Sequence, residues 1–593
     1  MERVYLCEMC NFNTVTIRHL NYHIIKWHRF AANFKAKCRH CGFSTRSHNS
    51  FKTHMSRKHR LKNDVEYRGQ IADEEFPNNE NVARMDPEEE LKKQCGTFVL
   101  KLMSKLNLPA SSVDEILSGT ANLLTLAKDL PGSGKVENHF AELKTHKRRM
   151  TYIKNNHDFI EPQRVYMGSE WKRKKDKKTK EIKLVKVNNY GYISPVKETI
   201  TQFLSKPDVY HEICTDHKSQ NGLMQDFCDA EYCKNSAYIS NHERCLQFVF
   251  NTDSMQICTA LSAHKSQKID VFFYQIVNIR PQFRSKWKNI HVYAICKSEF
   301  VQKHGYEEIM RDFIDTMLEL YEGIPLRING NEKMFHGIVL AITCDSPAAS
   351  AICGCKGSSV LAKKICRSCV ISSTQMQTKL KISDLQARSH QLHVDRCLAL
   401  DTMTKSNKNK WQTRWGITSS SPFLRLPYID IAFSFPHDVM HCVHHGALSH
   451  AIALILQRGL EQRYFSLEYL NSKLQSFPYN YLDSENRPES ISREHIFGSV
   501  KMHQTAAAIM HMSYYLPLIL GEKYPADDKY YKNFMQLVIF SVLVCSPYVT
   551  VDTAGQLQEI VECYLVQFKR IYPTIQLRPT QHFLLHIPHQ VPY

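Results

Sequence analysis

Eight cysteines and histidines near the N-terminus have the spacing of zinc ligands. They form two sets with identical spacing: Cys7, Cys10, His23 and His28, followed by Cys38, Cys41, His54 and His59. Zn²⁺ prefers four nitrogen and sulfur ligands in a tetrahedron, which a hairpin knuckle and one helix can supply. Two histidines that lie five positions apart project from one helical face. The repeat therefore predicts two ββα zinc fingers within residues 1–62, each folded around one structural Zn²⁺.

The nucleic-acid-reading positions of these fingers carry small or weakly specific side chains. In groove-binding fingers, helix positions −1, 3 and 6 face the bases. These positions are Thr16, His19 and Tyr22 in the first finger and Ser47, Ser50 and Thr53 in the second. None supplies the pairing of Arg with guanine or of Asn with adenine. We therefore expect little sequence readout, and binding to a nucleic-acid backbone or to a protein both stay open.

Two carboxylates end two predicted strands in the middle of the chain. Asp253 ends the strand predicted at 245–253, and Asp345 ends the strand predicted at 336–345. Strands at 268–277 and 290–296 and a helix around 309–320 are predicted between them. Three strands, a helix and a fourth strand are the order of an RNase H-like domain, in which the ends of strands one and four adjoin. Adjacent carboxylates favour a hard cation such as Mg²⁺ or Mn²⁺, which phosphodiester chemistry uses in pairs.

A further group of thiols is a candidate for another zinc site. Cys366 and Cys369 have knuckle spacing, and Asp438 or His441 could complete a composite site with them. A four-thiol site that includes Cys353 and Cys355 is an alternative. The third interpretation is that these are inert buried cysteines.

The net charge of +19 is concentrated in two blocks of the 593-residue chain. Residues 1–62 carry +11 and residues 141–190 carry +9. Such blocks are typical of phosphate binding, so DNA is the expected partner, although a solvated basic loop is the alternative for the second block. That block contains Lys172, Arg173, Lys174 and Lys175, which we predict to contact nucleic acid and which also resemble a nuclear import signal.

Composition and length indicate a multidomain α+β protein of the nucleus. No apolar run is long enough to span a bilayer, and no secretory leader opens the chain, so we expect no membrane partner. No small-molecule cofactor is indicated. Five regions are expected: two fingers at 1–62, an acidic flexible linker at 63–94, a helical and basic region at 95–240, an RNase H-like core at 241–371, and a helical insertion with the C-terminal part at 372–593.

Several short motifs resemble those of a known group of proteins. They are Asn155–Pro162, Phe272–Ser285, Cys344–Ala348, Cys366–Cys369 and Pro436–His441. In this order they resemble transposase-derived proteins of animal genomes related to CACTA (En/Spm-like) DNA transposons. The resemblance implies an RNase H-like DDE domain with a helical insertion at about 372–565. It also implies that Asp253 and Asp345 are the first two catalytic acids, and that Asp438 and His441 form a motif of the insertion.

The third acid of that family has no counterpart in this sequence. It is a Glu on a helix beyond the segment similar to Gln581–His589, whereas this chain ends at Tyr593. Glu559 and Glu562 are poor substitutes, so the resemblance implies a C-terminally truncated, catalytically incomplete core. We therefore expect a transposase-derived zinc-finger protein that binds DNA without strand transfer. An active or latent transposase or nuclease, and a zinc-finger protein–protein adaptor whose core forms a homodimer, are the alternatives.

Overall fold

The computed structural model describes four two-residue strands near the N-terminus and most of the chain from residue 87 onward. The described residues are 5–6, 13–14, 36–37, 44–45, 87–105, 110–128, 140, 143–175, 181–215, 217, 219, 222–257, 268–357 and 363–591. Two compact units divide the chain, Met1–Ala141 and Glu142–Tyr593, and each is described by itself.

Two short hairpins of the first unit bracket the Cys-x2-Cys pairs. Strand β1 (Tyr5–Leu6) pairs antiparallel with β2 (Asn13–Thr14), and β3 (Ala36–Lys37) pairs in the same way with β4 (Ser44–Thr45). The eight predicted zinc ligands and the six predicted base-reading positions lie outside the described residues. The two zinc fingers therefore stay a prediction.

The first unit also contains the helices α3 (Pro87–Leu100) and α4 (Ala110–Lys128) and the π-helix η2 (Lys101–Lys105). Helix α3 begins inside the predicted flexible linker, so that prediction is wrong for residues 87–94. Pro87 followed by Glu88, Glu89 and Glu90 is a favourable helix start, because proline fits the first helical position and acidic residues suit the positive end of the helix dipole.

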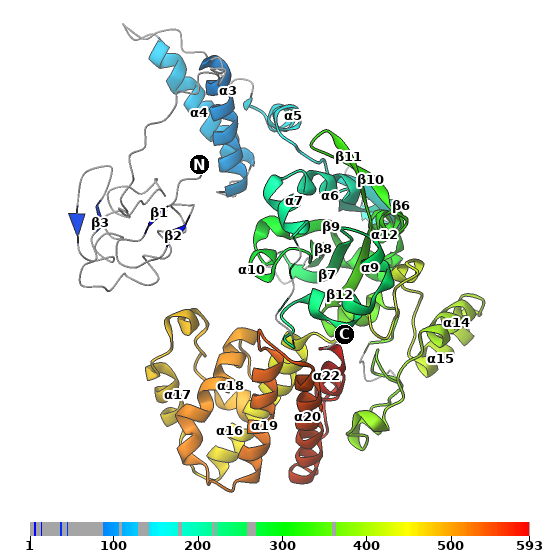
Figure 1. Cartoon of the computed structure of the whole chain (residues 1–593), viewed down its shortest axis with the longest axis vertical. Helices are drawn as coiled ribbons and strands as arrows, with labels where there is room; N and C mark the ends of the chain where they lie inside the picture. Colours follow the sequence, from blue (N-terminus) through cyan, green and yellow to red (C-terminus); the bar gives the residue numbers. More distant parts are fainter. Residues whose placement is uncertain are drawn as a thin grey trace. The chain divides into compact units, whose positions relative to one another are not determined.

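A six-stranded mixed sheet is the centre of the second unit. Its order is β12-β7-β8-β9-β6-β5, with β12 parallel to β7 and all other neighbours antiparallel. The strands are β5 (Gln163–Lys175), β6 (Ile182–Ile193), β7 (Leu246–Gln256), β8 (Lys268–Ile276), β9 (His291–Lys297) and β12 (Gly337–Cys344). Strands are thus present where the sequence predicts β7, β8, β9 and β12. The architecture is α+β, and Figure 1 shows α12 lying beside these strands.

Alternation along the central strands buries one face of the sheet against α12 (Glu307–Glu322). Every second residue of a strand points to the same face. Phe250 of β7 lies with its ring 4.8 Å from that of Phe313 on α12, and the rings of Tyr274 and Tyr293 lie 5.7 and 5.5 Å from it. This aromatic cluster fixes the sheet and so fixes the ends of its strands.

The region predicted as helical and basic, 95–240, is only partly helical. It contains α5 (His146–Asn156), α6 (Val196–Leu204), α7 (Pro207–Ile213), α8 (Glu231–Asn235) and α9 (Ala237–Asn241), but also the long hairpin β5–β6. β6 pairs with β9 only at Tyr192 and Ile193, so most of this ribbon extends beyond the sheet. Apolar residues do occur among the lysines of β6, at Ile182, Leu184, Val185 and Val187, but they keep no regular two-residue period.

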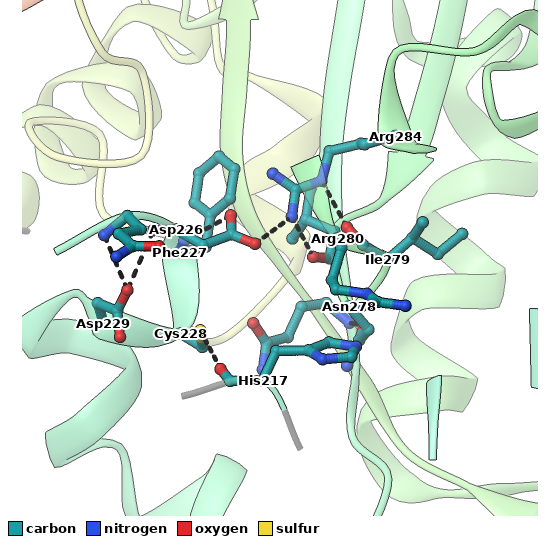
Figure 2. A network of polar contacts seen from close by, with 12 residues as sticks. His217, Asp226, Phe227, Cys228, Asp229, Asn278, Ile279, Arg280 and Arg284 are labelled. Carbon is teal, nitrogen blue, oxygen red and sulfur yellow. Dashed lines mark hydrogen bonds and ion pairs between the residues drawn. The ribbon is translucent and has the colours of Figure 1, made fainter. Parts of the chain in front are cut away.

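A polar network attaches the loop before β7 to the segment after β8. Arg284 Nη2 lies 2.7 Å from a carboxylate oxygen of Asp226 and donates to the carbonyl of Val277 at 2.6 Å, and its Nε donates to the carbonyl of Ile279. Figure 2 shows the guanidinium of Arg284, from the segment after β8, directed at the carboxylate of Asp226. The side chains of Arg284 and Asp226 are each only 12% exposed, so the pair is shielded from water.

Helices form the rest of the second unit. Its larger helices are α14 (His390–Asp401), α15 (Lys405–Trp415), α16 (Ser449–Glu461), α17 (Leu467–Ser476), α18 (Ala506–Leu520), α19 (Lys529–Val544) and α20 (Val551–Ile571). Its shorter elements are α10 (Pro281–Arg284), α11 (Ser298–His304), β10 (Ile324–Ile328), β11 (Asn331–Phe335), α13 (Ser346–Ile352), α21 (Pro579–Phe583) and α22 (Ile587–Gln590). Helices α16, α18, α19 and α20 share one buried apolar core and lie together in Figure 1. Within the described part of the chain, no helix is long and apolar enough to cross a membrane.

Candidate carboxylate site and metal centre

The parallel pairing of β12 with β7 brings Asp253 and Asp345 to the end of the paired stretch of these two strands. Asp345 directly follows β12, but β7 continues past Asp253 to Gln256 and pairs there with β8, so the prediction that Asp253 ends its strand is wrong. The last paired residues are Thr252 and Cys344, and the two aspartates directly follow them. Neighbouring strands lie about 4.8 Å apart. Asp345 caps α13, because its carboxylate accepts a hydrogen bond from the amide of Ala348 at 2.7 Å. The carboxylate of Asp253 accepts one from the amide of Ser254 at 2.7 Å and is exposed.

Asp438 and His441 form a hydrogen-bonded pair beside these strand ends. Nδ1 of His441 lies 2.5 Å from Oδ2 of Asp438, and the amide of His441 donates to the same oxygen at 2.9 Å. The segment that leads into this pair is held against the edge of the sheet, because the amide of Ile342 in β12 donates to the carbonyl of Ser434 at 2.8 Å. The π-helix η9 (Met440–Leu448) then carries His441.

Three carboxylates act on the imidazole of His441. The hydrogen bond with Asp438 raises the pKa of His441 first, and the negative charges of Asp438, Asp345 and Asp253 raise it further. Burial opposes ionisation of Asp438, but its hydrogen bonds from His441 outweigh burial and lower the pKa of Asp438. Asp438 therefore contacts His441 directly, whereas Asp345 and Asp253 influence it only through their charges. Such an acidic cluster attracts a cation.

Glu559 and Glu562 are not part of this cluster. Glu562 of α20 accepts hydrogen bonds from the amide of Ile382 at 3.1 Å and from the side chain of Gln558 at 3.2 Å. Glu559 is exposed on the same helix. Neither belongs to the carboxylates that act on His441.

A second cluster brings together Cys366, Cys369, His582 and His586. Their ligand atoms all lie within 4.8 Å of one another, and each residue is buried. Sγ of Cys366 lies 3.4 Å from Nε2 of His586, and Sγ of Cys369 lies 3.3 Å from Nε2 of His582. The two Nε2 atoms are 3.3 Å apart. Tetrahedral Zn–N and Zn–S bonds of about 2.0–2.3 Å imply edges of about 3.3–3.8 Å, and these three separations fall in that range.

Local structure presents these four ligands to one point. The Cys366-x2-Cys369 turn has the form of a knuckle, since the amide of Ser368 points at Sγ of Cys366 at 3.4 Å. Nε of Arg367 donates to the carbonyl of Phe435 at 2.9 Å and fixes the turn against the segment before η9. His582 and His586 lie four residues apart at the end of the chain's helical part, on α21 and the 3-10 turn η13 (Leu584–His586).

This cluster corrects the predicted composite site. Cys366 and Cys369 are joined by His582 and His586, whereas Asp438 and His441 lie with the carboxylates. The residue that adjoins the thiols from that segment is His437, whose Nε2 lies 3.0 Å from Oγ of Ser368 and whose ring stacks on His586. The spacing of four between His582 and His586 was the signal in the sequence, because it places both rings on one side of a helix.

The electrostatics of the cluster suit a metal. Burial opposes ionisation of Cys366, but hydrogen bonding with Cys369 and the nearby histidines hold its pKa below the usual range. A thiolate, rather than a thiol, is the form that binds a metal. Burial lowers the pKa of the neighbouring His437 to about 3, so this ring stays neutral and adds no positive charge.

The basic residues predicted to contact nucleic acid lie on the β5–β6 ribbon. Arg173 and Lys175 are exposed, and Lys172 lies 2.8 Å from the carboxylate of Glu170. Trp171 is 65% exposed in the same strand. Lys174 belongs to β5 as well.

No protein-family model matches the sequence, and no curated protein matches it either.

Proposed function

We propose that this chain is a transposase-derived, zinc-stabilised protein of the nucleus that binds DNA and carries a divalent-cation site on an RNase H-like core. The observation that supports this most is the parallel pairing of β12 with β7, which brings Asp345, directly after β12, next to Asp253 of β7. A parallel fourth strand beside the first of three antiparallel strands, with a helix between, is the order expected for that core.

The carboxylate cluster supports binding of Mg²⁺ or Mn²⁺. Both are hard cations that prefer carboxylate oxygens. Asp253 and Asp345 would hold the cation, and Asp438 holds His441 in a fixed orientation through two hydrogen bonds. A protonated His441 carries a positive charge that a nucleic-acid backbone attracts, and the hydrogen bond with Asp438 raises the pKa of this histidine.

The metal of the Cys366, Cys369, His582 and His586 centre is proposed to be Zn²⁺. Two thiols and two imidazoles form a closed, buried set with no position left for a substrate, which is typical of a structural site. Together with the two N-terminal fingers, this centre makes zinc a folding requirement for the chain.

DNA is the proposed partner because basic residues extend along an accessible ribbon. Positive charge on a projecting hairpin can follow a phosphate backbone, and exposed Trp171 can stack on a base or pack against a sugar. The first unit contributes the finger region, whose net charge of +11 favours the same partner.

A second candidate, phosphodiester cleavage or strand transfer, is favoured by one observation. Asp438 adds a third carboxylate to the charges that act on His441. Two-metal catalysis needs enough acids to hold both ions. We expect the Asp438–His441 hydrogen bond to hold this carboxylate in its present role, and we therefore expect no cleavage of transposon-end DNA in Mg²⁺ or Mn²⁺.

Binding to DNA can be tested by salt dependence. The affinity of the full chain for a labelled duplex, measured by fluorescence anisotropy, should fall steeply as salt rises. Replacing Lys172, Arg173, Lys174 and Lys175 by Gln should reduce the slope by about 0.9 for each phosphate that the protein no longer neutralises. The matched control neutralises Lys405, Lys408, Lys410 and Arg414 of α15. Equal effects of both sets, or an affinity that ignores salt, would contradict the proposal and favour a protein partner.

The cation site can be tested by thermal stability. Mn²⁺ should raise the melting temperature of the full chain, because a ligand that binds only the folded state stabilises it. Asp345→Asn should remove this shift while keeping the cap of α13, since Asn is also a good N-cap. Asp315→Asn on α12, which removes a carboxylate that pairs with Arg425 on the protein surface, serves as control. Cleavage of transposon-end DNA that disappears in Asp345→Ala would establish the second candidate instead.

A further inference from the structure

A second group of thiols and imidazole lies apart from the Cys366 centre. Cys353 and Cys355 follow α13, and His393 and Cys397 lie four residues apart on α14. Exposed fractions are 0%, 3%, 2% and 3% in that order, so all four side chains are buried. This group does not share a ligand with the centre at Cys366 and Cys369.

Backbone contacts bring the two pairs together. Gly354, between the cysteines, has φ +73°, and a Cβ there would lie 1.9 Å from the carbonyl oxygen of Ser419. Only glycine fits, so the Cys353–Cys355 turn is pressed against the segment at 417–419. Sγ of Cys397 points at that same carbonyl of Ser419 at 3.5 Å. The thiol of Cys397 and the Cys353–Cys355 turn therefore both lie against the carbonyl of Ser419.

The imidazole of His393 is buried with its polar atoms unsatisfied. Both ring nitrogens are inaccessible to water and make no hydrogen bond within the described residues. Leaving buried polar atoms unsatisfied destabilises the folded state. A metal bond would satisfy one nitrogen. His393 also lies beside Cys355.

The buried positive charge of a neighbouring arginine also favours a negatively charged metal centre. Arg388 is only 6% exposed, and its side chain donates to the carbonyls of Cys366 and Trp415. No carboxylate forms an ion pair with it in the described part of the chain. A buried cation requires compensating negative charge. Three thiolates and one neutral imidazole around Zn²⁺ carry a net charge of −1, which would supply it.

We propose that Cys353, Cys355, His393 and Cys397 form a second structural zinc centre of the second unit. Its ligands are three thiolates and one imidazole, from a Cys-x-Cys turn and a His-x3-Cys helix. The atoms are gathered less tightly than at the first centre, since no three of them all lie within 4.8 Å of one another. Sγ of Cys353 points at the carbonyl of Ser350 and Sγ of Cys397 at that of Ser419, so both thiols would turn about χ1 to reach the ion.

Zinc content of the full chain tests this centre. With the four finger cysteines (Cys7, Cys10, Cys38 and Cys41) replaced by Ala, elemental analysis should find two zinc ions per chain. Adding Cys397→Ala should leave one, and adding Cys397→His should restore two because histidine can replace the thiolate as a ligand. Cys296→Ala, which removes a buried cysteine of β9, is the matched control and should keep two.

An inert buried cysteine gives the opposite pattern. Ala would then be tolerated at position 397 with no loss of zinc, whereas the larger imidazole would unfold the chain. That result, or a single zinc ion in the parent with disabled fingers, would overturn the proposal. If no variant at position 397 folds, the zinc content of the parent with disabled fingers is the test: two ions support the second centre and one ion contradicts it. Adding Cys366→Ala separates the two centres, because it should remove one ion and leave the other.

Discussion

At the residue scale, burial rather than sequence position determines which ionisable groups have a shifted pKa. His291 of β9 packs between Phe203 and Tyr274, with ring centroids 4.3 and 5.1 Å away, and its buried Nε2 makes no hydrogen bond among the described residues. Burial, helped by the charge of Lys206, lowers its pKa from 6.5 to about 4. The folded protein therefore resists protonation of this ring while the unfolded chain does not.

His291 should make stability fall as pH falls. A histidine whose pKa is lower in the folded state does not reduce the free energy of unfolding at a pH above its unfolded pKa. As the pH falls from about 6.5 toward 4, the unfolded chain takes up the proton more readily, so the folded state becomes less stable. The loss would reach up to about 3 kcal/mol. His291→Phe keeps the ring stacking and removes the titration, so melting temperatures of the variant and the parent should diverge below pH 6.5. Parallel curves across that range would contradict the assignment.

Residue types alone predicted part of the site. Asp253 and Asp345 could be expected together, because each follows an apolar run and the order of strands implies that these runs adjoin. The partners of Cys366 could not be chosen in the same way. Asp438 and His582 both offer a ligand in the sequence, and only the packing of α21 against η9 determines which one reaches the thiols.

At the element scale, one arginine connects a long loop to the sheet. Arg284 donates to the carbonyls of Val277 and Ile279 and pairs with Asp226, which begins the turn Phe227–Asp229. Its loss would leave both carbonyls and a shielded carboxylate without this partner. Removing one member of a buried ion pair typically costs about 3–5 kcal/mol, and partial exposure reduces that figure.

Arg284→Ala should lower the free energy of unfolding by about 2–3 kcal/mol in urea denaturation. Arg284→Lys should recover only part of the loss, because lysine cannot make the same fork of bonds. As control, Arg311→Ala breaks an exposed pair with Glu308 and should cost less than about 1 kcal/mol. Similar costs for Arg284 and Arg311 would mean that the network in Figure 2 does not stabilise the loop.

Elements were predictable where their apolar pattern was dense. The strands β7, β8, β9 and β12 carry runs of buried aliphatic and aromatic residues, and each lies close to its predicted place. The β5–β6 ribbon was missed because most of it lies beyond the sheet, where exposed Ile182 and Leu184 alternate with lysines instead of forming a buried face. A hairpin without a core leaves only a weak period in the sequence.

At the scale of the whole molecule, the buried cluster of Cys366, Cys369, His582 and His586 joins segments that are far apart in the chain. Cys369 and His582 are separated by 213 residues, and Cys366 and His586 by 220. An ion that binds all four side chains would close the long loop between Cys366 and His586, which contains the helical part. It would therefore contribute most to the stability of the two segments at the ends of that loop. The sheet is held instead by its own aromatic core and by hydrogen bonds between strands.

Removal of zinc should therefore loosen the helical part before the sheet. In hydrogen exchange measured by mass spectrometry, a chelator should raise exchange at 365–371 and 579–590 while β7 and β8 stay protected, because those strands do not depend on the ion. Cys366→Ala without chelator should reproduce the change at the two metal-binding segments and leave β7 unaffected. Unchanged exchange at 579–590 would show that the cysteines and histidines pack together without a metal. Simultaneous loss of protection in β7 would show that the sheet and the helical part form one cooperative unit, with the metal stabilising both.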